Sequence, residues 1–221
     1  MEGTLDENKI CFITCVNDPA EYEECKLYLS HLELPDGMEV ELLEIREASS
    51  MAAGYMEGMQ SSKARYKVYV HQDVRILHPR FIEYILQIFR SDAGIGMIGM
   101  VGCPCLPADG IMWHGERVGY SNNSIDRLKT YDVERDGLVQ VEAVDGFLMA
   151  TQYDLPWQAE IFDGWDFYDI SQAAEFIKHG YQVVVPDQNG SWAVHEEKSV
   201  VSLWNYDPYR RRFLEKYKGI V

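Results

Sequence analysis

The sequence has little positive charge. It holds 20 Lys and Arg against 36 Asp and Glu, which gives a formal net charge of −16 at pH 7. Because nucleic acids are polyanions, we expect no nucleic-acid partner for so acidic a chain. The one basic cluster, YRRRFLEKYK at 209–218, is short. Any anionic small molecule that binds would need a metal cation or a group of backbone N–H donors to offset the local repulsion.

Long hydrophobic runs and paired cysteine motifs are also missing. The longest apolar runs, such as 181–186, fall far short of the roughly 20 residues of a membrane helix, so we expect no integral membrane segment. The acidic start MEGTLDEN lacks the basic and apolar regions of a signal peptide. No CxxC pair occurs, and the CxC of Cys103 and Cys105 alone is a weak zinc signal. These features predict a cytoplasmic protein with reduced thiols and leave its oligomeric state open.

Apolar strands alternate with amphipathic helices along the first half of the chain. Four stretches are predicted strands: 9–16, 38–45, 66–77 and 94–102. Three helical patterns lie between them: 18–32, 49–62 and 79–91. The first helix opens with Asp18 as its N-cap and Pro19 at its first position. Because parallel strands need crossover connections, this alternation predicts an α/β fold with a parallel sheet flanked by helices.

Polar residues follow the first three of these strands. The strand ends read CVND, EIRE and HQDV, and ligands of parallel α/β sheets bind beyond such carboxyl ends. The third end is unusual, because His71 and Asp73 interrupt the otherwise apolar stretch YKVYVHQDVRIL. An ionised carboxylate is costly to bury unpaired. Asp73 and His71 are therefore either solvated at a strand end or hold something charged.

The second half of the chain has a different character. Residues 103–139 are rich in Gly, Asn, Asp and Trp and show no sustained period, which predicts a long irregular or hairpin-bearing insertion. A strand-like run broken at Asp145 and Gly146 follows, and then a helix over 165–180 and a buried strand at 181–186.

We interpret residues 1–221 as one domain, because a chain of 221 residues is of single-domain length. A nucleotide-binding half spans 9–102, an acceptor half spans 103–200, and 201–221 form an amphipathic C-terminal helix. Three aromatic residues of that helix are predicted to pack on the body: Tyr209, Phe213 and Tyr217. Its arginines, 210–212, either form a solvated face or assist an anionic ligand.

The order of motifs over 9–195 resembles the family 2-like glycosyltransferases of the GT-A fold. The resemblance rests on AAGYMEGMQSSKARYKVYVHQDV, VDGFLMA and FDGWDFYDISQAAEFIKHGYQVVVP, taken in sequence. It implies a Rossmann-like, mostly parallel mixed sheet. It further implies a nucleotide-diphospho-sugar donor, an acceptor hydroxyl on a glycan or another molecule, and a bound Mn²⁺ or Mg²⁺.

The metal residues implied by the resemblance are Asp73 and His195. The family has an Asp-x-Asp element at the end of a strand, and HQD stands in its place here, with Asp73 as the second acid and His71 replacing the first. His195 resembles a late histidine that completes the metal site in many members. If His71 ligates, it favours Mn²⁺ over Mg²⁺. The alternative is a polar turn and a structural histidine.

The resemblance also implies a set of nucleotide- and sugar-binding positions. They are Thr14, Cys15, Asn17, Glu44, Gly54, Tyr55, His71, Gln72, Asp145 and Gly146. Simpler interpretations stand beside several of them. Glu44 is equally consistent with a solvated strand end, and Asp145 with Gly146 is equally consistent with a tight turn. Trp113, Trp165 and Phe167 either stack on sugar faces or pack in the core.

The catalytic base implied by the resemblance is Asp169, with Asp166 in reserve. An inverting transfer needs a carboxylate that takes the proton of the attacking acceptor hydroxyl. The family's Glu-Asp motif aligns with Tyr168 and Asp169, so the glutamate is absent, and Ser171 stands where a further acid is common.

The resulting hypothesis is a metal-assisted, inverting glycosyltransferase that favours a UDP-sugar. The first alternative is a catalytically lapsed GT-A domain that binds a nucleotide or glycan without turnover, and the missing acids favour it. A nucleotidyltransferase ranks last, because CVNDPAEYEE is not the basic, Gly-rich loop that such an enzyme needs.

Overall fold

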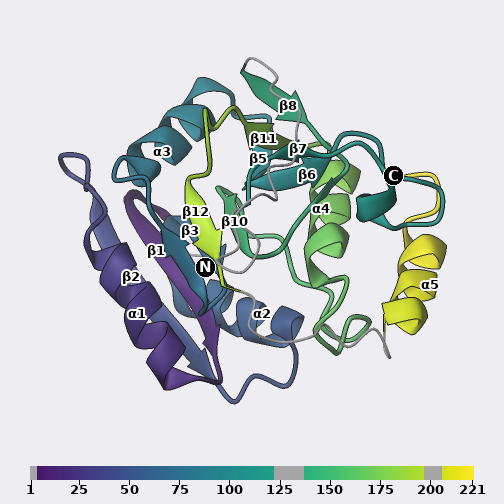
Figure 1. Cartoon of the computed structure of the whole chain (residues 1–221), viewed down its shortest axis with the longest axis horizontal. Helices are drawn as coiled ribbons and strands as arrows, with labels where there is room; N and C mark the ends of the chain where they lie inside the picture. The colour runs from purple at the N-terminus through teal and green to yellow at the C-terminus, as the bar shows by residue number, and fades with distance from the viewer. Residues whose placement is uncertain (1–3, 122–136, 197–205) are drawn as a thin grey trace.

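A seven-stranded sheet forms the centre of the computed structural model, which describes residues 4–121, 137–196 and 206–221 (Figure 1). The strand order is β2 (Glu39–Arg46), β1 (Asp6–Val16), β3 (Ala64–Val70), β10 (Leu148–Thr151), β5 (Ile95–Gly99), β11 (Gln182–Pro186) and β8 (Leu138–Gln140). Strand β10 is antiparallel to β3 and β5, and β8 is antiparallel to β11, whereas the other strands all run the same way. The predicted α/β fold with a mostly parallel mixed sheet is confirmed.

Two predicted strands are each divided in two. The stretch 66–77 contains β3 and then β4 (Val74–Ile76), which leaves the main sheet and pairs antiparallel with β12 (Ala193–His195). The stretch 94–102 likewise contains β5 and most of β6 (Val101–Cys103), which joins β7 (Val118–Gly119) and β9 (Ala143–Val144) in a separate sheet. Apolar composition predicted extended backbone correctly, but it carries no information on which sheet a strand joins.

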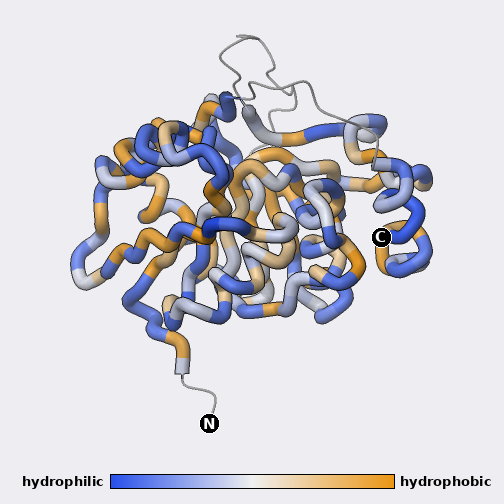
Figure 2. Tube along the Cα trace, turned by 90° about the horizontal axis from the view of Figure 1, so that it is seen from below, coloured by the Kyte–Doolittle hydropathy of each residue, from blue (hydrophilic) through white to orange (hydrophobic). Residues whose placement is uncertain are grey.

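Helices cover both faces of the main sheet. They are α1 (Pro19–Ser30), α2 (Met51–Ser61), α3 (Phe81–Ser91) and α4 (Tyr168–Lys178). Alternate residues of β1 point to opposite faces, so Phe12 packs in one core cluster with α1 and α3, and Ile13 packs in another with α2 and part of α4. Hydrophobic stretches accordingly run through the middle of the molecule (Figure 2). Asp18 caps α1, accepting the N–H groups of Ala20 and Glu21, as predicted.

The C-terminal helix α5 (Tyr206–Lys216) lies on the opposite side of the molecule from α1 (Figure 1). The predicted packing of Tyr209, Phe213 and Tyr217 is confirmed, since they are 9%, 1% and 1% exposed. Part of the predicted helix, 201–205, and part of the predicted insertion, 122–136, lie outside the described residues. The rest of the insertion includes the 3₁₀ turn Met112–His114 and strand β7. In the described part of the chain, no helix combines the length and apolarity needed to cross a bilayer.

Candidate active site

The polar turn 71–73 lies where β3 ends and β4 begins, and Gln72 ties it to the neighbouring strand end. The side-chain oxygen of Gln72 accepts the backbone N–H groups of Asn17 at 2.9 Å and Asp18 at 3.0 Å. Its amide nitrogen donates to Oδ1 of Asn17 at 2.5 Å. The loop after β1 and the turn after β3 are therefore held together at the carboxyl edge of the sheet, where the sequence predicts a ligand site.

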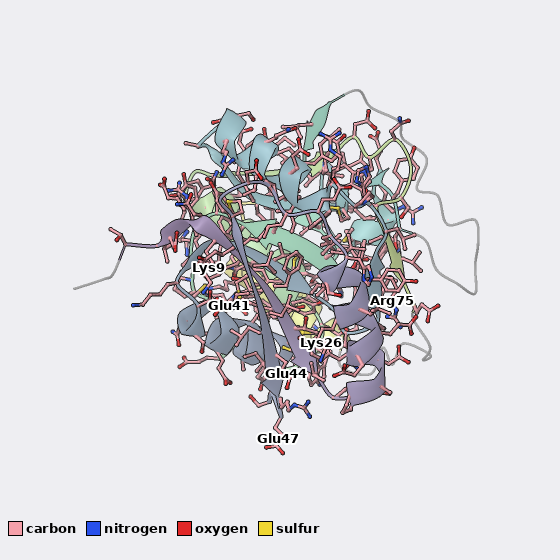
Figure 3. All side chains as sticks on the ribbon, turned by 90° about the vertical axis from the view of Figure 1, so that its left-hand side faces the viewer. Lys9, Lys26, Glu41, Glu44, Glu47 and Arg75 are labelled. Atoms are coloured by element: carbon pink, nitrogen blue, oxygen red, sulfur yellow. The ribbon has the colours of Figure 1, made fainter. Side chains whose placement is uncertain are left out.

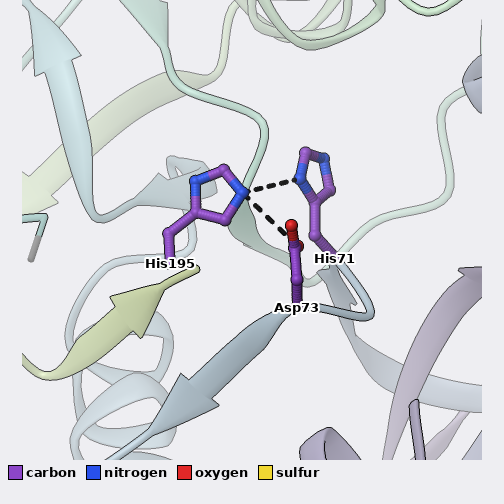
Figure 4. Close-up of side chains that lie close together, drawn as sticks. All are labelled: His71, Asp73 and His195. Atoms are coloured by element: carbon purple, nitrogen blue, oxygen red, sulfur yellow. Dashed lines mark hydrogen bonds and ion pairs between the residues drawn. The ribbon is translucent and has the colours of Figure 1, made fainter. Parts of the chain in front are cut away.

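His71, Asp73 and His195 converge at this edge (Figure 4). Strand pairing brings them together, because the antiparallel register of β12 with β4 sets His195 opposite Val74. Nε2 of His195 lies 3.4 Å from Nδ1 of His71 and 3.4 Å from Oδ1 of Asp73. One ligand atom from each residue falls within 4.8 Å of the others, and this is the one such metal-binding group among the described residues.

The protonation states of this cluster suit a divalent metal. Burial, together with the nearby His195, lowers the pKa of His71 to about 3, so its imidazole is neutral at physiological pH. Burial would raise the pKa of Asp73, but the hydrogen bond and charge of His195 outweigh it, and the pKa of Asp73 is lowered. A neutral imidazole and a carboxylate are ordinary ligands of Mn²⁺.

Ion pairs hold strand β4 behind this cluster. The buried guanidinium of Arg75 lies beside α1 (Figure 3) and contacts Glu21 at 3.0 Å, Glu24 at 2.7 Å and Glu196 at 3.8 Å. The carboxylate of Glu21 is thus paired with Arg75. Because Arg75 follows Asp73 by two residues, these contacts limit how far the turn can move.

A cavity of about 220 Å³ opens beside the cluster. Its lining is Cys15, Val16, Asn17, Glu47, Ala48, Met51, His71, Gln72, Asp73 and Trp165. The walls come from the ends of β1 and β3, the loop before α2 with the first residue of that helix, and the loop before α4. The cavity combines two carboxylates, two amides and the indole of Trp165, which is 52% exposed. These groups are able to bind polar and ring-shaped parts of one ligand.

Asp169 is hydrogen-bonded to the turn that contains Asp145 and Gly146. Its Oδ2 accepts the N–H of Gly146 at 3.0 Å, and its Oδ1 accepts the N–H of Ile170 at 2.8 Å. Burial, and then the charge of Asp145, raise the pKa of Asp169 to about 7. A carboxylate with a pKa near neutrality can accept a proton at physiological pH, as a general base must. The pKa of Asp145 is itself raised by burial.

The turn 145–147 connects Asp169 with the histidines. The carbonyl of Phe147 accepts the backbone N–H of His71 at 3.0 Å, and the Phe147 ring stacks on His195 with centroids 5.4 Å apart. Nε2 of His71 in turn lies 2.5 Å from the hydroxyl of Tyr168, the residue before Asp169. Contacts through this turn and Tyr168 therefore link the base candidate to the metal-binding candidates.

The chain matches a known family over nearly its whole length. Residues 11–217 fit the model of the family described as glycosyltransferase like. The chain belongs to this glycosyltransferase-like family. No curated protein matches the sequence.

Solved structures of glycosyltransferases share the fold. TarS of S. aureus, residues 1–349 in complex with UDP, superposes with a TM-score of 0.62 at 7% identity, covering 94% of this chain and 65% of that one. The mannosyltransferase PcManGT of Pyrobaculum calidifontis, in complex with GDP-Man and Mn²⁺, gives a TM-score of 0.57 at 12% identity, covering 96% of this chain and 64% of that one. The family member described here thus spans less than two thirds of either protein. The likeness confirms the predicted GT-A fold.

Several residues predicted to bind the nucleotide do not line this cavity. Thr14 and Tyr55 are each 0% exposed. A Cβ on Gly54 would lie 2.4 Å from Sγ of Cys15, so this glycine allows α2 to pack closely on β1. Glu44 is exposed and pairs with Arg46 at 2.9 Å. Core packing thus uses Thr14, Gly54 and Tyr55, whereas Glu44 makes a surface ion pair.

The sequence patterns did not identify three residues that line the cavity: Glu47, Ala48 and Met51. Glu47 is the last residue of EIRE, so the strand-end rule pointed to it as much as to Glu44. Both carboxylates project near the end of β2 (Figure 3), and only that of Glu47 lines the cavity. Glu47 has a φ of 56°, a left-handed value that is uncommon outside glycine, and it turns the chain into the cavity wall.

The other aromatic and basic candidates have structural partners. Phe167 is 3% exposed and packs against α5, with ring centroids 4.9 Å from Tyr206 and 5.7 Å from Phe213. Its φ of 63° costs about 1 kcal/mol for a non-glycine residue, and this packing holds it in place just before Tyr168 and Asp169. Trp113 is 38% exposed and has Arg117 over its ring.

The arginines of α5 are paired with acids of the same surface. Arg210 and Arg211 contact Asp207, and Arg212 contacts Asp163 at 3.0 Å. The solvated, ion-paired interpretation of this basic cluster therefore fits better than a diphosphate site. The reserve base Asp166 is partly buried, which raises its pKa.

Proposed function

We propose that this chain transfers a sugar from a nucleotide-diphospho-sugar, with a UDP-sugar favoured, to an acceptor hydroxyl with inversion at the anomeric carbon. One observation carries the proposal. The turn 145–147 joins a carboxylate with a pKa of about 7 to a His-Asp-His cluster at the carboxyl edge of the sheet. These are the two groups that an inverting transfer requires, a proton acceptor and a site for the leaving diphosphate.

In the proposed reaction, Asp169 acts as the general base. The acceptor oxygen attacks the anomeric carbon, and the bond from that carbon to the diphosphate oxygen breaks. Asp169 takes the proton of the acceptor hydroxyl as the new bond forms. The N–H groups of Gly146 and Ile170 hold the Asp169 carboxylate in place.

The cluster and the cavity hold the donor. Asp73 and His195 would bind Mn²⁺ or Mg²⁺, and this ion, when bound, supplies Lewis-acid stabilisation of the negative charge on the departing diphosphate. It also offsets the repulsion between an anionic donor and a chain with a net charge of −16. The amides of Asn17 and Gln72 and the indole of Trp165 line the cavity where the nucleotide or sugar would lie. The cytoplasmic location stays a prediction.

Product formation tests the proposal directly. Purified protein with Mn²⁺ is incubated with a panel of nucleotide-sugars, and release of the nucleoside diphosphate is measured with and without sugar acceptors. Asp169→Asn should lose turnover by a factor of roughly 10² to 10⁴ while it still binds the nucleoside diphosphate. NMR of the product's anomeric proton reports inversion or retention.

A lapsed, binding-only domain is the second candidate. The observation that favours it is Tyr168, which occupies the position of the family's glutamate beside the base. Tight, Mn²⁺-dependent binding of a nucleoside diphosphate, without hydrolysis or transfer from any donor of the panel, would support this candidate and overturn the enzymatic one.

A further inference from the structure

We propose that Tyr168 is a positioning residue for the metal cluster, whose hydroxyl holds His71 so that Nδ1 of His71 acts as a third protein ligand beside Asp73 and His195. The inference adds detail to the proposed function. It rests on that function only for the statement that the bound metal assists sugar transfer. It concerns two residues in which this chain departs from the resembled family, the histidine of HQD and the tyrosine of FYD.

The geometry gives the two imidazole nitrogens of His71 different partners. Nε2 lies 2.5 Å from the hydroxyl oxygen of Tyr168, whereas Nδ1 lies 3.4 Å from Nε2 of His195. A neutral imidazole has a single N–H proton. When that proton is on Nε2 and the phenol oxygen accepts it, the lone pair of Nδ1 is left to face the cluster. A hydrogen bond from the far nitrogen of a ligating histidine is the usual way in which its tautomer is set.

Packing prevents Tyr168 from turning away. Its side chain is buried, and a Cβ on Gly146 would lie 2.1 Å from the Tyr168 oxygen, so the phenol lies directly against the backbone of this turn. The ring also contacts Tyr55 and Trp157, with centroids 5.9 and 6.4 Å away. The backbone N–H of His71 is held by Phe147 at 3.0 Å. Both partners of the hydrogen bond are thus fixed before any ligand binds.

The donor set then has a clear chemical preference. Two imidazole nitrogens and one carboxylate suit Mn²⁺ and neighbouring transition ions better than Mg²⁺, which prefers oxygen ligands and retains its water molecules. An aspartate at position 71 would shift that balance back toward oxygen. Tyr168 and His71 are therefore expected to function together. The Tyr168 hydroxyl orients the imidazole of His71, and a carboxylate at position 71 would not need this hydrogen bond.

The experiment measures Mn²⁺ binding without turnover. The dissociation constant comes from the EPR signal of free aqueous Mn²⁺ at increasing protein concentration, in the presence and absence of UDP and without any sugar donor. Tyr168→Phe removes only the hydroxyl, and we expect at least about tenfold weaker Mn²⁺ binding. The matched control is Tyr217→Phe, which removes a buried hydroxyl that donates to Glu175 at 2.9 Å. Glu175 lies on α4, the helix that also carries Tyr168. We expect no change in Mn²⁺ affinity for this control.

A double-mutant cycle distinguishes a specific effect of Tyr168 on the position of His71 from a general loss of order in the site. His71→Ala should weaken Mn²⁺ binding, and Tyr168→Phe added to it should cause no further loss, because the hydroxyl acts through His71. Equal Mn²⁺ affinity of Tyr168→Phe and the unmodified protein, or additive losses in the double variant, would overturn the inference and leave the proposed function standing. A protein that binds no Mn²⁺ even with UDP would overturn both the inference and the metal-assisted part of the proposed function.

Discussion

The carboxylate of Asp169 accepts the backbone N–H of Gly146 at 3.0 Å, across the turn that also carries Asp145. The contact places the candidate base beside a second acid in a partly buried setting. Burial and the charge of Asp145 together raise the pKa of Asp169 to about 7. The site thus keeps a carboxylate partly protonated at neutral pH, and its base function should depend on pH in the physiological range.

The pH dependence of transfer should report this carboxyl group. The base works in its deprotonated form, so kcat/KM should rise about tenfold per pH unit below the pKa of about 7 and level off above it. Asp145→Asn removes a neighbouring charge, lowers the pKa of Asp169 and should shift the midpoint to lower pH. The exposed Glu160→Gln serves as the control and should leave the midpoint in place. An unchanged midpoint in Asp145→Asn would contradict this account of the pKa.

Asp73 should couple nucleotide binding to the metal. A ligand that binds only the folded protein raises its melting temperature, so UDP with Mn²⁺ should stabilise the protein more than either alone. We expect Asp73→Asn to abolish the Mn²⁺-dependent part of this thermal shift. Asp36→Asn, an exposed loop carboxylate away from the cavity, should retain it. A full shift in Asp73→Asn would exclude this carboxylate from the metal site.

Gln72 should matter through the loop that it holds. Gln72→Ala leaves the N–H groups of Asn17 and Asp18 without their side-chain acceptor, which should cost about 0.5–1.5 kcal/mol of the free energy of unfolding. UDP affinity should fall with it, because the loop forms part of the cavity wall. Gln72→Glu keeps an acceptor oxygen and should recover much of the loss in denaturant titrations. Identical stability and affinity in all three proteins would show that the loop does not depend on this side chain.

Gly146→Ala should damage stability and the site together. The added Cβ would lie 2.1 Å from the Tyr168 oxygen, so the phenol or the turn must move, at about 1–3 kcal/mol in unfolding free energy. Gly94→Ala is the comparison, because its nearest atom is a movable surface carboxylate oxygen of Asp92 at 3.0 Å. Urea unfolding should separate the two variants, with Gly146→Ala clearly the less stable. The reverse order would mean that the turn is more adaptable than its packing indicates.

Local patterns predicted most of the elements and the edge of the sheet that carries the site. The cap at Asp18 and the buried aromatic face of α5 followed from spacing alone, because capping and amphipathicity act within a few residues. The turn 71–73 stood out for the same reason, since polar residues interrupt an apolar run. Glu44 and Glu47 show the limit of such patterns. Glu44 lies near the end of β2 and Glu47 directly follows it, and the backbone turn at Glu47 determines which one lines the cavity.

The sequence by itself determined the alternation of strands and helices, the family resemblance and the acidic character of the chain, because these depend on residue type and spacing. Only the tertiary structure decided which side chains meet. His195 reaches His71 across 124 residues because β12 pairs with β4, and the pKa of Asp169 rises because folding partly buries it beside Asp145. Strand pairing and burial are properties of distant segments brought together, and no local pattern encodes them.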